Sequence, residues 1–271
     1  MKKGILGFIV GVVATLGLVL CFYAGMQFAK KEDSKDAKTE EKETNKKPEK
    51  TEGKIELDID HDEVQEAARA LPFALCHEYF LRLDGKSREV SDLKDSEKMA
   101  MVMAYYTEDL FNNGADEDEY KMELSEAQIE RLFEDTSFLK MLKKDQFSMD
   151  ARTMENKDGK YIFSAYPTGC VADEYEGDNL TLYRAYKEDD KLVLVYAYSW
   201  EVTKFNEKID DFEITFYKSK GDKSVVVKNP EFDDNAQEYK VDWSKFNSYE
   251  FVYDISDGNL RIQEINFVKA K

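Results

Sequence analysis

Residues 179–202, "NLTLYRAYKEDDKLVLVYAYSWEV", contain two runs of β-favouring residues separated by acidic residues. Aromatic and β-branched side chains favour strands, whereas aspartate favours the turns between them. The stretch therefore predicts a strand, a turn around Asp189 and Asp190, and a second strand. Alternation from Leu192 to Val202 predicts one packed face and one more polar face on the second strand.

The same pattern recurs on both sides of this stretch. Turn signals at Asp158, Gly221 and Gly258 divide further β-rich runs, which lie in residues 157–166, 211–227 and 248–268. We therefore expect antiparallel strands over about residues 158–271. The polar residues 229–245 between two of these runs predict a long loop or a poorly ordered insertion.

Residues 60–146 show helical periodicity instead. Apolar residues recur at three- and four-residue intervals within residues 60–83, 95–111 and 124–135. Pro72 must kink the first helix or begin a new one, and Ser125 with Gln128 matches a capping box. Helices followed by antiparallel strands predict an α+β domain with helices packed on a curved antiparallel sheet, and not a doubly wound fold.

An uncharged apolar run from Gly4 to Ala29 precedes this domain. A bilayer needs about 20 helical residues, so the run is long enough to span it. Cys21 lies within it, but Leu20 precedes the cysteine where lipid attachment would need a small side chain. We therefore expect residues 1–31 to be an uncleaved transmembrane anchor, with lipidation of Cys21 as the alternative.

The orientation of this anchor is open to two interpretations. Two lysines precede the apolar run and four follow it closely, a count that would place the domain inside the cell. The following lysines alternate with acidic residues, however, and long domains cross membranes largely regardless of charge. We expect the domain to be extracytoplasmic. Residues 32–56 are so polar that we expect a disordered charged linker.

The acidic domain, residues 57–271, excludes one class of partner. From residue 55 onward there are 28 Lys and Arg against 49 Asp and Glu, a net charge of −21. Such a field repels phosphate backbones, so nucleic acid is not expected as a partner. A protein or small-ligand partner remains unidentified, and the oligomeric state is not indicated by the sequence.

Candidate catalytic and metal-binding groups are few. Cys76 and Cys170 can form a disulfide in an oxidising space or remain two buried thiols. His77 with Cys170 would be a nucleophile and its base, but only across the fold. Acidic residues cluster at positions 116–126 and 173–178 without calcium-site spacing. No nucleotide, hydrolase or zinc motif occurs, so no catalytic residue, cofactor or metal is assigned.

Aromatic residues recur at intervals of two or three along the predicted strands. Most such residues would form core and cross-strand pairs. The alternative is a concave surface that binds a peptide, glycan or small apolar ligand. Its candidate residues are Tyr166, Tyr183, Tyr196, Tyr198 and Trp200.

The element order, with "YIFSAYPTGC" at 161–170 and "YEFVYDISDGNLRIQEI" at 249–265, resembles the nuclear transport factor-like, or cystatin-like, α+β cone. More specifically, it is similar to extracytoplasmic domains of single-pass envelope proteins of low-GC Gram-positive type. The resemblance implies a curved sheet wrapped around a helix, with a pocket at the wide end. Members include enzymes, ligand binders and scaffold subunits of transfer machines, so the fold does not decide the function.

From these features we expect a membrane-tethered, extracytoplasmic binding or assembly domain without enzymatic activity. Two alternatives remain: an envelope hydrolase that uses a pocket carboxylate or Cys170, and a scaffold subunit of a transfer or secretion machine.

Overall fold

The structure is a computed structural model that describes residues 53–71, 84–113, 115–116, 119–143, 146–149, 152–165, 174–206, 211–233 and 238–270. All of them belong to one compact unit, Lys50–Lys271. The expected anchor, residues 4–29, lies outside these ranges, as does most of the expected linker. Within the described ranges, no helix has both the length and the apolar composition needed to span a bilayer.

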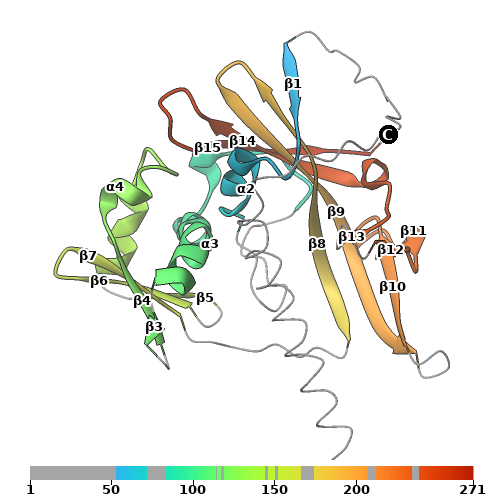
Figure 1. The fold of residues 1–271 in the computed structure, drawn as a ribbon, viewed down its shortest axis with the longest axis horizontal. Helices are drawn as coiled ribbons and strands as arrows, with labels where there is room; N and C mark the ends of the chain where they lie inside the picture. Colours follow the sequence, from blue (N-terminus) through green and yellow to red (C-terminus); the bar gives the residue numbers. More distant parts are fainter. Residues whose placement is uncertain are drawn as a thin grey trace, which may run out of the picture. The chain divides into compact units, whose positions relative to one another are not determined.

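The described residues form a mixed α+β fold with two large antiparallel sheets and one separate pair of strands, which confirms the predicted α+β class (Figure 1). The larger sheet has eight strands, and six of them follow the order β1-β8-β9-β14-β15-β2. Its strands are β1 (Lys54–Leu57), β2 (Arg88–Glu89), β8 (Tyr175–Glu188), β9 (Lys191–Asn206), β10 (Asp211–Tyr217), β11 (Val225–Lys228), β14 (Asn247–Asp254) and β15 (Arg261–Val268).

The β8–β9 hairpin is the centre of this sheet. Glu188 pairs with Lys191, which leaves Asp189 and Asp190 as the two-residue turn and confirms the predicted turn. Asp189 has a φ of 53°, a left-handed conformation that aspartate adopts more readily than most side chains.

Strand β9 is shared by two branches of the sheet. One of its edges pairs with β8, while the opposite edge pairs with β14 along Lys191–Tyr198 and with β10 along Trp200–Asn206. Ser199 lies between the two partners and is 1% exposed. The strands β10 and β11 therefore diverge from β14 and β15 at this residue.

A second sheet occupies part of the region that the periodicity assigned to helices. Its order is β3-β4-β7-β6-β5, with bounds β3 (Ala115–Asp116), β4 (Glu119–Leu124), β5 (Phe147–Met149), β6 (Arg152–Lys157) and β7 (Lys160–Ala165). The expectation of helices before about residue 146 and strands only after 158 is therefore wrong. Tyr120, Met122 and Leu124 alternate with charged residues and pack on the core, a two-residue period hidden within an acidic segment.

Helix α3 (Asp95–Asn113) packs between the two sheets. Five consecutive residues, Met99–Met103, have no exposed surface, which a helix with only one packed face could not achieve. The helix contacts β4, β5 and β7 of the smaller sheet. It also meets the larger sheet, where Arg88 of β2 forms a buried ion pair with Glu97 at 2.9 Å.

Two shorter helices carry well-defined N-terminal caps. Helix α2 (Asp62–Ala68) begins after His61, whose Nδ1 accepts a hydrogen bond from the Glu63 amide. Helix α4 (Glu126–Ile129) begins at the predicted Ser125–Gln128 capping box, which is confirmed. It ends earlier than the expected residue 135, and a short 3₁₀ helix, η2 (Ser137–Lys143), follows it.

The polar stretch at residues 229–245 contains short ordered elements between its loops, so the expectation of a long loop or a poorly ordered insertion is only partly right. It contains the strand pair β12 (Phe232–Asp233) and β13 (Glu238–Tyr239) and the 3₁₀ helix η3 (Trp243–Lys245). The Trp243 ring lies 5.3 Å from the Phe216 ring of β10. The few aromatic side chains of the 229–245 stretch thus pack against the larger sheet and form a small core with it.

The expected linker also ends earlier than residue 56. Residues 54–56 belong to β1, which pairs with the end of β8 from Lys54↔Glu188 to Leu57↔Ala185. Ile55 and Leu57 give this short strand two apolar residues, and Leu57 packs against the main core.

Candidate functional site

The predicted aromatic surface is divided between two faces of the larger sheet. Tyr196, Tyr198 and Trp200 alternate along β9 and are at most 7% exposed. Tyr196 and Tyr198 belong to the main buried core, so their rings are not part of an open surface. Tyr183 packs on the opposite face, against Val193 and its neighbours. Tyr166 lies outside the described residues.

The polar atoms of these aromatic side chains meet the acidic cluster of residues 173–178. The Tyr198 hydroxyl donates to Asp178 Oδ1 at 2.5 Å, and Trp200 Nε1 donates to Glu176 Oε1 at 3.1 Å. Burial is the main cause that raises the pKa of Tyr198, and the hydrogen bond to Asp178 is the second. The aromatic residues of β9 and the acidic cluster, which are separate in the sequence, therefore lie together in the structure. The carboxylates of the cluster accept hydrogen bonds from the buried aromatic side chains.

Gly177 lies beside this arrangement, under the Tyr175 side chain. The Tyr175 hydroxyl donates to the Asp178 carbonyl at 2.8 Å and crosses over Gly177. A Cβ at position 177 would lie 2.4 Å from the Tyr175 hydroxyl oxygen, so a side chain there would displace the Tyr175 ring from its present position.

The groups considered for catalysis or metal binding give no assembled site within the described ranges. His61 is an N-cap, while Cys76, His77 and Cys170 lie outside the described residues, so the disulfide remains a prediction. In those ranges, no three His, Cys, Asp or Glu side chains are grouped closely enough to hold a metal ion.

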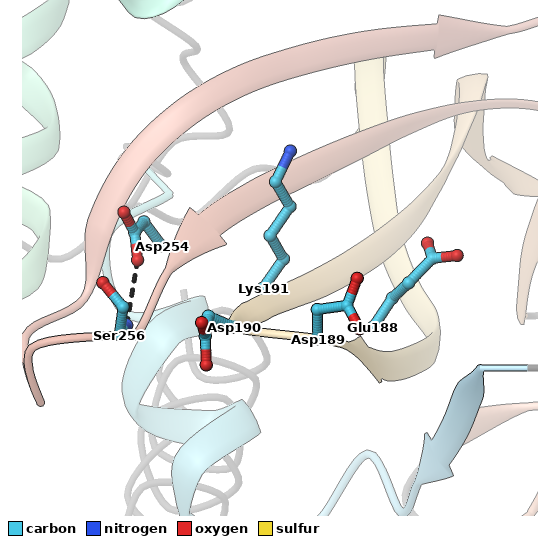
Figure 2. A pocket seen from close by; sticks show the side chains of 6 residues that line it. All are labelled: Glu188, Asp189, Asp190, Lys191, Asp254 and Ser256. Carbon is cyan, nitrogen blue, oxygen red and sulfur yellow. Dashed lines mark hydrogen bonds between the residues drawn. The ribbon is translucent and has the colours of Figure 1, made fainter.

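An open pocket lies where the turn of β8–β9 meets the end of β14 (Figure 2). The Ile255 amide donates to the Asp190 carbonyl at 2.9 Å, which joins the two segments. The pocket has a volume of about 430 Å³, and its lining residues are Glu188, Asp189, Asp190, Lys191, Asp254 and Ser256.

This pocket has an excess of negative charge. Glu188 is 3.5 Å from Lys54, and Lys191 is 3.6 Å from Glu264, so its only lysine already has an acidic neighbour. Figure 2 shows the Lys191 ammonium directed away from Asp190. Within the described part of the chain, Asp189, Asp190 and Asp254 have no ion pair.

The electrostatics of Asp254 favour the ionised carboxylate. The Ser256 amide donates to Asp254 Oδ1 at 2.9 Å, and this hydrogen bond lowers the pKa of Asp254. A general acid at neutral pH would need a raised carboxyl pKa. Asp254 is therefore suited to attracting a positive group rather than to donating a proton.

Sequence reasoning recognised Asp189 and Asp190 only as turn residues. The available signal was the charged run "KEDDK" at 187–191, but its relation to Asp254 depends on the β9–β14 pairing. A neighbouring pocket of about 280 Å³ has balanced charges by comparison, because Lys187 pairs with Glu63 and Arg131 with Glu66.

Comparisons of the chain with protein-family models, with curated proteins and with solved structures gave no match.

Proposed function

We propose that this chain is a non-enzymatic binding or assembly domain of the cell envelope, tethered to the membrane through residues 4–29, and that a basic protein partner docks at the pocket of Figure 2. The observation that supports this most directly is the set of three carboxylates, Asp189, Asp190 and Asp254, without ion pairs among the described residues. A partner that brings lysine or arginine would neutralise them.

The charge of the whole domain supports the same kind of partner. Each exposed ion pair contributes about 0–1 kcal/mol, so three carboxylates alone would not hold a partner tightly. A net charge of −21 from residue 55 onward would also steer a basic protein toward the domain and raise its association rate. This association should weaken strongly with added salt.

The proposal also includes three features of the architecture that the sequence predicts. We retain the transmembrane anchor, the charged linker and the likeness to a nuclear transport factor-like cone, in which a curved sheet packs on a helix. The second sheet would be an addition to that fold. Binding of this kind needs no cofactor.

Membrane orientation can be tested with Asp189→Cys in the full chain. We expect a membrane-impermeant maleimide to label it in intact, wall-stripped cells more strongly than the unsubstituted chain, whose three cysteines give the background. Labelling only after the cells are broken would contradict an extracytoplasmic domain.

The partner site can be tested with a photoreactive residue at the exposed Ser256 of the full chain in its own membranes. We expect an adduct with a basic protein, with a yield that falls with salt and falls severalfold further in D189N/D190N/D254N. The matched control is E155Q/D158N/E174Q, which removes three exposed carboxylates elsewhere and should leave the yield unchanged. Equal yields in the two triple variants would rule out this pocket as the docking site.

A further inference from the structure

A second cavity, separate from the pocket of Figure 2, lies between η1 (Val90–Asp92), α3 and β15. It has a volume of about 410 Å³ and shares no lining residue with that pocket. Its lining residues are Val90, Ser91, Lys98, Phe133, Glu134, Asp135, Ile262 and Gln263.

Lys98 is the unusual member of this lining. Its side chain extends from the first turns of α3 and the residue is only 8% exposed. The adjacent Glu97 is engaged with Arg88 and with the Lys94 amide. Over the ranges that the structure describes, Lys98 has neither an ion pair nor a side-chain hydrogen bond. The Lys98 stem is therefore buried while its ammonium, without an ion pair, can meet an anion that enters the cavity.

The neighbouring Asp135 does not fill this role. Its two carboxylate oxygens accept hydrogen bonds from the amide and hydroxyl of Ser137, at 2.9 and 3.0 Å. These bonds, with a smaller contribution from the charge of Lys98, lower the pKa of Asp135. Lys98 and Asp135 therefore both line the cavity without an ion pair between them.

The rest of the cavity combines an apolar floor with an acidic rim. Phe133 and Ile262 are each 2% exposed, and the Ile262 amide donates to the Leu132 carbonyl at 3.0 Å, which fixes the floor. Glu134 is exposed at the rim. A phosphate dianion would be repelled by two nearby carboxylates, whereas a zwitterion brings no net charge and offers each group an opposite partner.

We propose that this cavity binds a free hydrophobic α-amino acid. Its carboxylate would meet Lys98, its ammonium would meet Glu134, and its side chain would contact Phe133 and Ile262. Binding of an amino acid in this cavity would be separate from the docking of the basic partner proposed above, because the two sites have no residue in common.

The test is a titration of the full chain, solubilised in detergent, with L-leucine followed by saturation-transfer NMR. We expect saturable binding below about 10 mM. Leucinamide, which lacks the carboxylate, should not bind. N-acetyl-leucine, which lacks the ammonium, should bind about tenfold more weakly, a loss of about 1.4 kcal/mol.

Variants of the chain separate this site from general effects. Lys98→Met should weaken leucine binding at least tenfold without lowering the thermal midpoint, because it removes the charge that would meet the carboxylate while keeping the buried apolar stem and breaking no ion pair. Lys94→Met, an exposed lysine outside the cavity, is the matched control and should bind as the unsubstituted chain does. Ser91→Trp at the exposed rim should block the cavity.

Absence of saturable leucine binding, equal binding of leucinamide, or unchanged binding by Lys98→Met would each overturn the assignment. Tighter binding of Ala-Leu than of leucine would assign the cavity to peptide carboxyl termini and overturn the choice of a free amino acid. The D189N/D190N/D254N variant should bind leucine normally, so failure at one site is distinguishable from failure at the other.

Discussion

Tyr196 and Tyr253 are two core tyrosines whose hydroxyl groups have different surroundings. Tyr253 donates to the Ala67 carbonyl at 3.0 Å, which connects β14 to the end of α2. The Tyr196 hydroxyl is buried, and no hydrogen-bond partner for it exists among the described residues. A buried hydroxyl without a partner loses its hydration and gains nothing in return.

We predict opposite effects when each of these tyrosines is replaced by phenylalanine. Tyr196→Phe should leave the free energy of unfolding unchanged or raise it by about 1 kcal/mol, because it removes an unsatisfied polar group. Tyr253→Phe should lower it by about 1 kcal/mol, since the buried hydrogen bond to the Ala67 carbonyl is lost, while the Ala70 amide still donates to that oxygen. Urea unfolding of the full chain measures both. A larger loss for Tyr196→Phe than for Tyr253→Phe would contradict this description of the core.

A single extra residue explains why the predicted aromatic surface is divided. A regular hairpin with the observed turn would place Tyr183 directly opposite Tyr196, on the same face. The strand has a bulge between Leu182 and Arg184, so Leu182 pairs with Tyr196 instead. Tyr183 is consequently turned to the other face. The alternation is visible in the sequence, but the bulge depends on the packing of both faces and has no local signal.

At the scale of elements, the branch formed by β10, β11 and residues 229–246 has its own small core. Phe216, Phe246 and Ala197 form a buried cluster separate from the main one, with Trp243 packed against it. Phe246 is 2% exposed, and its ring lies 6.5 Å from the Phe216 ring. The branch therefore depends on a few aromatic contacts.

Phe246→Ala should lower the free energy of unfolding by about 3 kcal/mol, since it leaves a cavity in this small core. The loss should be local, so amide hydrogen exchange should accelerate in β10 and β11 more than in β8. Lys245→Ala is the control, because this exposed residue contributes only a surface ion pair with Asp242. Uniform acceleration across the larger sheet would show that the branch is not a separate unit.

The elements that the sequence predicts well are those with strong local signals. Asp158 and Gly159 both have positive φ, 54° and 83°, as the two-residue turn between β6 and β7 requires. Strand β4 was missed because its apolar residues alternate with charged ones inside an acidic segment. The insertion at 229–245 was missed because its order comes from contacts with Phe216, which lies elsewhere in the chain. The pocket of Figure 2 was missed for the same reason, since strand pairing brings Asp254 to Asp190.

At the scale of the whole molecule, buried tyrosines link stability to alkaline pH. Nine of the described tyrosines have a pKa raised above the ordinary value of 10.0, and burial is the largest cause for each of them. They belong to both sheets and to α3, so their ionisation would affect the entire fold.

We predict that the free energy of unfolding falls as pH rises above about 10. Above this pH the unfolded chain releases its tyrosine protons, while the folded chain retains them because its tyrosine pKa values are higher. The unfolded state then binds fewer protons, and stability decreases with pH by about 1.4 kcal/mol per unit for each fully buried tyrosine, such as Tyr196 or Tyr253. Below pH 10 both states are protonated, and this contribution to stability is fully present.

Tyrosinate absorbance and circular dichroism, measured on the same full-chain samples between about pH 8 and 12, test this prediction. We expect most tyrosines to ionise together with the loss of structure, rather than in a separate step near pH 10. Repulsion among the acidic side chains would also favour alkaline unfolding, but added salt screens exposed charges and should shift a transition of that origin to higher pH. A transition governed by buried tyrosines should move little with salt. Ionisation of all tyrosines near pH 10 with an unchanged circular dichroism spectrum would contradict the burial that defines this core.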